Sequence, residues 1–174
     1  MKRLLRYLVV APMIVAPLSV NANELFDRYF AEIDGAKVCY SRTYDAAHLQ
    51  QHPRQATRLI ELAFDSAQRK RKSPTGSAFE VTLGLMVKDK SELFMSPAYC
   101  STENDSFLCR VEGDGGTFRL TPSTSSGLTL RVIGDGIRME GESGFIEVGG
   151  KRSDDNLFLL SRMSADRCQI KSAR

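Results

Sequence analysis

The side chains best suited to chemistry gather between positions 42 and 55, a segment that contains both histidines of the chain, His48 and His52. Two histidines four residues apart on a helix lie on the same side, where they could share a metal ion with Asp45 as a further ligand or hydrogen-bond partner. The zinc motif H-E-x-x-H is not present, because Leu49 follows His48. We therefore predict no metal ion or other cofactor. The candidate binding residues of this segment are Arg42, Tyr44, Asp45, His48, His52 and Arg54. A simpler interpretation is a linker helix with Asp45 as its N-cap.

Two further segments are candidate binding sites. The basic run is Arg69, Lys70, Arg71 and Lys72. It suits anionic lipid headgroups, acidic glycans or an acidic protein surface, although a solvated hairpin tip explains it equally simply. It has no aromatic neighbours on which nucleic-acid bases could stack, so we predict no nucleic-acid partner. The second segment contains Glu103 and Asp105, an acidic tip that could enter an enzyme cleft.

Catalytic motifs are not found in the sequence, and we predict that the protein is not an enzyme. No G-x-S-x-G stretch occurs. The densest serine cluster, residues 123–126, stands between Pro122 and Gly127, which is typical of a turn. A carboxylate pair for hydrolysis would need two acids converging on a cleft, and the acidic residues between 140 and 147 fall in strands of mixed polarity.

The first 22 residues resemble a secretory signal peptide. A basic start precedes an apolar run from Leu8 to Leu18, and residues 20–22 offer the small-x-small cleavage pattern. The run is too short to span a bilayer, which needs about 20 apolar residues. Removing the three basic residues of this leader from the 24 Lys and Arg leaves 21, equal to the 21 Asp and Glu. We predict an exported, electrically neutral domain at residues 23–174, in the periplasm or secreted, without an integral membrane segment.

Four cysteines lie in this exported part, and an even number in an oxidising compartment indicates two disulfides. Of the three possible pairings we favour Cys100–Cys109, which closes a short loop rich in turn formers. Cys39–Cys168 then joins the start of the core to the end of the chain.

Hydrophobic periodicity predicts a mainly β protein. A short amphipathic helix, capped by Asn23, carries an apolar stripe up to Ile33. A second short helix is expected near residues 45–51. Alternation of period two then marks the strands, most clearly from Phe79 to Lys88. The other expected strands are 37–43, 57–65, 93–100, 107–112, 117–121, 128–133, 137–142, 145–148 and 156–162. Two Gly-Asp-Gly stretches, 113–115 and 134–136, are expected to be hairpin turns at the same end of the sheet.

Short strands joined by short turns favour an antiparallel meander that closes into a small barrel of eight to ten strands, since closure removes exposed edges. A two-sheet sandwich is the alternative. Candidate interior residues include Phe145, Phe158 and Leu159. In outline the chain resembles the small exported disulfide-bonded barrels of calycin or lipocalin type, a group that includes lysozyme inhibitors and lipocalin-like carriers.

The expected function is a non-enzymatic binding module that contacts a protein or cell-envelope component. Two alternatives remain open from the sequence. One is a lysozyme-inhibitor-like protein that blocks an enzyme cleft with a loop. The other is a carrier of a small apolar ligand inside the barrel.

Overall fold

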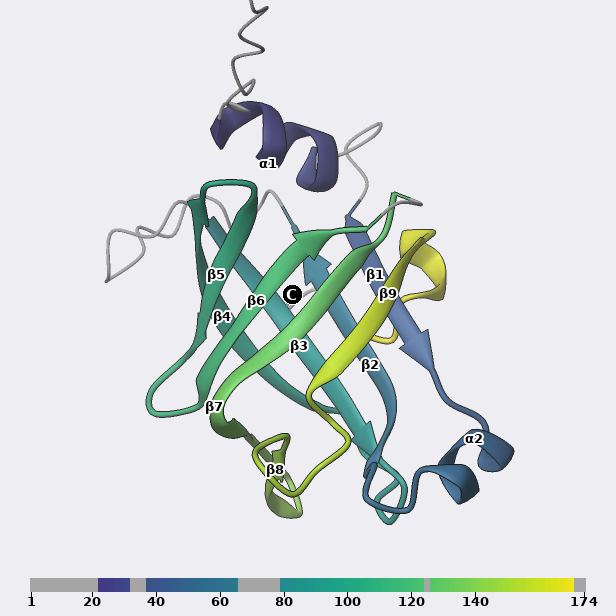
Figure 1. Ribbon diagram of the computed structural model, residues 1–174. Coiled ribbons are helices and arrows are strands. Elements are labelled where there is room, and N and C mark those ends of the chain that lie inside the picture. The colour runs from purple at the N-terminus through teal and green to yellow at the C-terminus, as the bar shows by residue number, and fades with distance from the viewer. Residues whose placement is uncertain (1–21, 32–36, 66–78, 124–125, 171–174) are drawn as a thin grey trace, which may run out of the picture.

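The computed structural model describes residues 22–31, 37–65, 79–123 and 126–170. Eight antiparallel strands close into a barrel, and a ninth strand lies outside the ring (Figure 1). The predicted antiparallel barrel is confirmed, and ring closure excludes the two-sheet sandwich. No helix of the described residues is long and apolar enough to span a bilayer.

The elements follow the predicted strands closely. The helices are α1 (Ala22–Phe30), α2 (Ala46–Gln51) and a 3₁₀ helix, η2 (Ala165–Arg167). The strands are β1 (Val38–Thr43), β2 (Thr57–Phe64), β3 (Phe79–Val87), β4 (Phe94–Glu103), β5 (Ser106–Val111), β6 (Gly116–Pro122), β7 (Leu128–Gly141), β8 (Gly144–Val148) and β9 (Leu157–Met163). β1 to β6 form a meander. β6 then pairs with β7, β7 with β9 and β9 with β1, which closes the ring.

Side chains fill the barrel interior. Alternate residues of each strand point inward because successive side chains of a strand lie on opposite faces. The fully buried side chains of the strands include Phe94, Phe107, Phe118, Phe158, Leu83 and Leu120. A barrel of eight strands is just wide enough for such side chains to occupy it.

Helix α1 covers one end of the barrel (Figure 1). Its apolar face joins a cluster of phenyl rings in which neighbouring centroids lie 4.8–6.2 Å apart. The helix is also held by the Tyr40 hydroxyl, which donates to the carbonyl of Tyr29 at 2.8 Å. The clustered rings are those of Phe26, Phe30, Phe64, Phe79 and Phe107.

The second half of β7 pairs with β8 at the opposite end of the barrel (Figure 1). Ile137 and Met139 of β7, together with Ile146 and Val148 of β8, are buried against the core. Gly141 permits this close approach, because a Cβ atom there would lie 2.6 Å from the ring of Phe94. Both ends of the apolar interior are thus covered by the chain itself.

Both predicted disulfides are present. Cys100–Cys109 joins directly opposite positions of β4 and β5 and is buried in the core. Cys39–Cys168 lies on the outer wall and fastens the end of the chain to β1. Two disulfide bonds fit a protein of an oxidising, non-cytoplasmic compartment.

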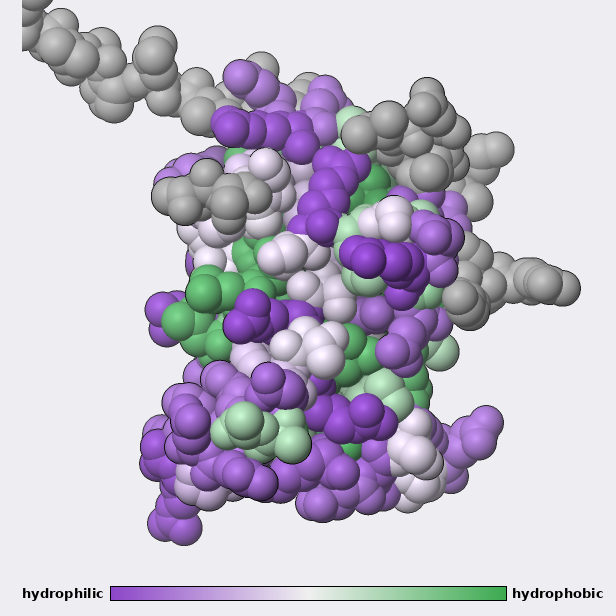
Figure 2. Space-filling model, turned by 90° about the vertical axis from the view of Figure 1, so that its right-hand side faces the viewer, coloured by the Kyte–Doolittle hydropathy of each residue, from purple (hydrophilic) through white to green (hydrophobic). Residues whose placement is uncertain are grey.

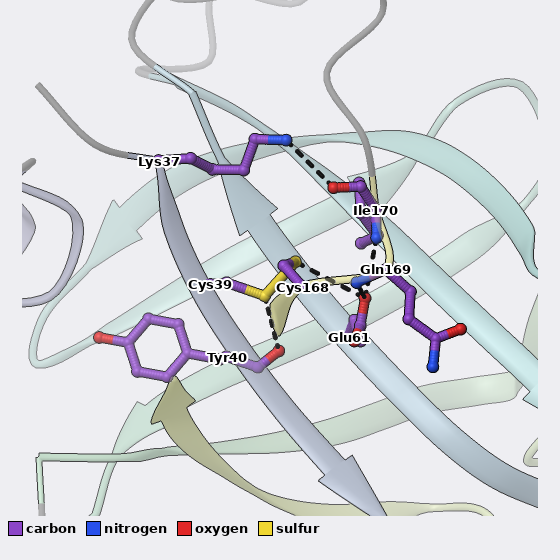
Figure 3. The surroundings of a disulfide bond; sticks show 7 residues. All are labelled: Lys37, Cys39, Tyr40, Glu61, Cys168, Gln169 and Ile170. Atoms are coloured by element: carbon purple, nitrogen blue, oxygen red, sulfur yellow. Dashed lines mark hydrogen bonds between the residues drawn. A yellow bond between two sulfur atoms is a disulfide. The ribbon is translucent and has the colours of Figure 1, made fainter. Parts of the chain in front are cut away.

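Residues 164–170, which we call the C-terminal strap, lie against the outer faces of β1 to β3 (Figure 3). One carboxylate oxygen of Glu61, a β2 residue only 1% exposed, accepts hydrogen bonds from the backbone N–H groups of Gln169 at 2.8 Å and Ile170 at 3.0 Å. The Lys37 ammonium donates to the carbonyl of Ile170 at 3.1 Å. A Cβ atom at Gly84 would lie 2.9 Å from the Ile170 side chain, so the glycine makes room for the strap.

Four details of the sequence interpretation are wrong, and three of them concern the strands. Only the first Gly-Asp-Gly stretch lies in a turn, whereas residues 134–136 lie inside the continuous strand β7. There they form an irregularity, because Gly116 pairs with Ile137 while the next residue of β6 pairs with Ile133. Phe145 and Leu159 face solvent, at 59% and 57% exposed, instead of the interior.

Phe145 and Leu159 are exposed because successive side chains of a strand point to opposite faces. Phe158 and Leu159 are adjacent in β9, so only one of them can point inward, and that residue is Phe158. Phe145 lies on the outward face of the β7–β8 ladder, opposite Glu140. At the other end of the chain, α1 already begins at Ala22, so Asn23 lies within its first turn instead of capping it. Ile33 lies outside the described residues.

Candidate functional site

Helix α2 forms the connection from β1 to β2 and begins as the sequence predicts. The Asp45 side chain accepts a hydrogen bond from the backbone N–H of His48 at 2.8 Å, which is the N-cap interaction. His52 ends the helix, and its backbone N–H donates to the carbonyl of His48. The following residue is Pro53, whose ring disfavours a helical conformation at the position before it. The helix is therefore confined to six residues.

Three rings stack along this connection at intervals of four residues. The rings of Tyr44 and His48 have centroids 4.6 Å apart, and those of His48 and His52 are 4.3 Å apart, with interplanar angles of 30° and 26°. The guanidinium of Arg42 lies over the Tyr44 ring at 5.3 Å. His48 and His52 are neighbours because they lie four residues apart at the end of α2, whereas Tyr44 precedes the N-cap and reaches His48 from the extended end of β1. A guanidinium, a phenol and two imidazoles thus form one continuous stack.

Gln55 fixes the middle of this stack. Its side chain is 5% exposed, and its Nε2 donates to the carbonyl of Thr57 at 2.9 Å. The amide oxygen therefore faces Nε2 of His48 at 3.0 Å, so this imidazole nitrogen carries the proton and donates. The orientation of the His48 ring is set by these two bonds.

The loop before β9 is hydrogen-bonded to the start of β2. Buried Asp155 accepts hydrogen bonds from the backbone N–H groups of Ala56 at 2.7 Å and Thr57 at 3.1 Å. Beside it, Arg54 and Asp154 form an ion pair at 2.6 Å. These contacts hold the beginning of β9 next to the ring stack.

A hollow of about 260 Å³ lies between the stack and β9. It exists because β1 and β9 pair only from Cys39 to Ser41 and then diverge, while β9 continues along β7 to Leu157. Leu157 and Leu159 border it and are 44% and 57% exposed. We call this place the ring-stack hollow; its lining residues are Arg42, Tyr44, His48, His52, Gln55, Asp154, Leu157 and Leu159. Figure 2 shows one side wall of the barrel, with apolar residues in its middle and hydrophilic residues at its lower end.

The carboxylates around the ring-stack hollow all have partners, whereas one of its cations has no carboxylate partner among the described residues. Asp45 caps α2, Asp154 is paired with Arg54, and Asp155 accepts two backbone hydrogen bonds. Among the described residues, Arg42 has no carboxylate at ion-pairing distance. Burial raises the pKa of the Tyr44 phenol, an effect that the neighbouring Arg42 partly offsets. The hollow therefore combines apolar walls, a neutral phenol and one unneutralised cation.

The two histidines are not arranged as a metal site. Their rings stack nearly face to face, so the in-plane lone pairs do not converge on one point. Among the described residues, three potential metal ligands converge only at Cys39, Glu61 and Cys168, where the disulfide has consumed both thiolates.

The other candidate residues lie elsewhere. Glu103 ends β4 and forms an ion pair with Arg119 at 3.1 Å, and Asp105 lies in the exposed two-residue turn that follows. This turn is at the α1 end of the barrel, opposite α2 (Figure 1). The basic run 69–72 lies outside the described residues.

Sequence reasoning missed Gln55, Asp154 and the outward role of Leu157 and Leu159. One usable signal was present. Residues 157–160 are apolar without interruption, although a strand with one wet face alternates polar and apolar residues. Such a run indicates that a strand exposes apolar side chains or is covered on both faces.

The fold defines a class: a closed eight-stranded antiparallel barrel with two disulfides and a partly apolar hollow on its outer wall. Comparison of the chain with protein-family models, curated proteins and solved structures gave no match.

Proposed function

We propose that this protein is a non-enzymatic binding module, exported to the periplasm or beyond, that contacts a protein or cell-envelope component through the ring-stack hollow. The observation that carries the proposal is the ordered Arg42–Tyr44–His48–His52 stack beside two exposed leucines. Tyr and Arg are the residue types most enriched at energetically dominant interface positions, and ordered rings lose little entropy on binding.

Export is supported by the basic and apolar leader and by the two disulfides. Surface recognition is favoured over ligand transport, because the interior is occupied by side chains and both barrel ends are covered. Cleft blocking by the β4–β5 tip is less favoured, because the Glu103 carboxylate is engaged by Arg119 and the turn is only two residues long.

The test is site-specific photo-crosslinking in intact cells. A photoreactive amino acid at Leu159 is compared with one at Phe145, which is equally exposed at 57% against 59% but lies on the β7–β8 hairpin. We expect a discrete adduct from position 159 that position 145 does not give. The adduct should be lost when Tyr44→Ala and His48→Ala remove the stack. Identical adduct patterns at both positions, or no adduct at position 159, would contradict the proposal.

A further inference from the structure

We propose that the ring-stack hollow takes an apolar side chain with a carboxylate next to it, presented by an internal acidic–apolar segment of a protein partner. The inference rests on the proposed function, since it names the chemistry of the partner at the same site. It is argued from the size of the hollow, from its charge and from the strand edge beside it.

The size and walls of the hollow suit one apolar side chain. Its volume of about 260 Å³ is below the roughly 300–1,000 Å³ that is typical of sites for whole small molecules. Leu157 and Leu159 form one wall, and Tyr44 lies in the opposite wall. An inserted side chain would bury leucine surface that is now 44–57% exposed.

The charge of the hollow selects a carboxylate. The acids around it are already paired with Arg54 or with backbone N–H groups, whereas Arg42 lacks an acidic partner among the described residues. The Arg42 guanidinium lies over the Tyr44 ring and forms a side-chain hydrogen bond with that phenol, which engages one N–H donor and leaves the others for a further ligand. Those donors match the two oxygens of a carboxylate.

The strand edge favours an extended internal segment. Pairing of β9 with β1 ends at Ser161, while pairing with β7 continues to Leu157. β9 therefore has an edge beside the hollow that β1 does not cover. Such edges bind extended peptides through backbone hydrogen bonds, with alternate side chains entering pockets.

Three peptides test the proposal: acetyl-Asp-Leu-amide, the neutral acetyl-Asn-Leu-amide, and acetyl-Gly-Leu with a free terminal carboxylate. Binding is followed by proton NMR of the imidazole signals at matched pH. The chain has only two histidines, His48 and His52, and both line the hollow, so these signals report its occupancy directly.

We expect the Asp peptide to shift both imidazole signals and to bind at least about fivefold more tightly than the Asn peptide, an advantage of about 1 kcal/mol. Arg42→Gln should abolish that preference, whereas Arg110→Gln, which removes an exposed arginine on β5 that does not line the hollow, should leave it unchanged. Leu159→Ser should weaken both peptides, while Phe145→Ser should weaken neither.

Equal binding of the Asp and Asn peptides, preference for the free terminus, or unshifted imidazole signals would overturn the inference. If the crosslinking adduct at Leu159 persists in any of those cases, the binding module stands and only the partner chemistry is wrong. If the adduct is also missing, the proposed function fails as well.

Discussion

Replacing Glu61 with glutamine should lower the free energy of unfolding by about 2 kcal/mol. The same oxygen, Oε2, accepts from both Gln169 and Ile170, so a glutamine amide oxygen can take its place. What is lost is the charge. A hydrogen bond to an ionised group contributes about 1.5–3 kcal/mol and a neutral one about 0.5–1.5 kcal/mol, a difference of about 1 kcal/mol for each of the two bonds.

Glu61→Ala removes both bonds, which would cost about 3–6 kcal/mol if the strap stayed in place. The two final strap residues can instead detach into water, and the loss is then limited mainly to the burial of Ile170, which is 3% exposed. Burying an isoleucine side chain contributes about 1.5–3 kcal/mol, so we expect a loss close to 3 kcal/mol for alanine.

Urea unfolding followed by circular dichroism measures these losses, and native-state amide exchange locates them. Exchange at Gln169 and Ile170 should accelerate in both variants, whereas exchange in the barrel strands should change far less. Glu147→Gln, an exposed glutamate on β8, is the matched control and should change stability by less than about 0.5 kcal/mol. Unchanged stability and unchanged exchange in Glu61→Gln would refute the idea that this carboxylate holds the strap.

Three further predictions concern the core and the disulfides. Replacing both Cys39 and Cys168 with alanine should lower the free energy of unfolding by about 5 kcal/mol on the chain-entropy model, because their sequence separation is 129. Removing the β4–β5 disulfide, with a separation of 9, should cost less, and an equal loss in urea unfolding would contradict that model. Burial raises the pKa of Tyr40 to about 12, so this phenol binds its proton more tightly in the folded state, and its stability contribution should be lost as the pH rises from about 10 to about 12. Ultraviolet titration should show that late ionisation step, and Tyr40→Phe should remove it. Phe30→Ala should lower the free energy of unfolding by about 3–5 kcal/mol, because this residue of α1 points its fully buried ring into the barrel. A loss below about 1 kcal/mol in urea unfolding would show that α1 does not close the barrel.

The positions and inward faces of the barrel strands could be predicted from the sequence, because the alternation of apolar and polar residues within a strand reflects which of its side chains are buried. In β3, Phe79, Val81, Leu83 and Leu85 alternate with residues of the other face, and all four face the interior. Both disulfides were also predicted, from the even number of cysteines and from the turn formers between Cys100 and Cys109. The outer face of β3 is more buried than the alternating sequence pattern predicts, because the C-terminal strap covers Gly84.

The boundary of β7 was not accessible in the same way. Gly134 and Gly136 both have positive φ, a conformation also common in turns, yet the chain continues in one strand past them. The same glycine geometry serves a turn or a strand irregularity, and the choice depends on whether partner strands continue on both sides. Here β6 and β8 supply those partners.

The candidate site also combines features set by local sequence with features set by the tertiary structure. The four-residue spacing of His48 and His52 and the N-cap at Asp45 are local, so the amino-acid sequence alone determined the short helix that places the two imidazoles on one side. Tertiary structure alone decided that Leu157 and Leu159, more than 100 residues away, form the facing wall, because that depends on where two closing strands diverge. Local patterns depend on neighbours a few positions away, whereas a hollow depends on how the ring closes.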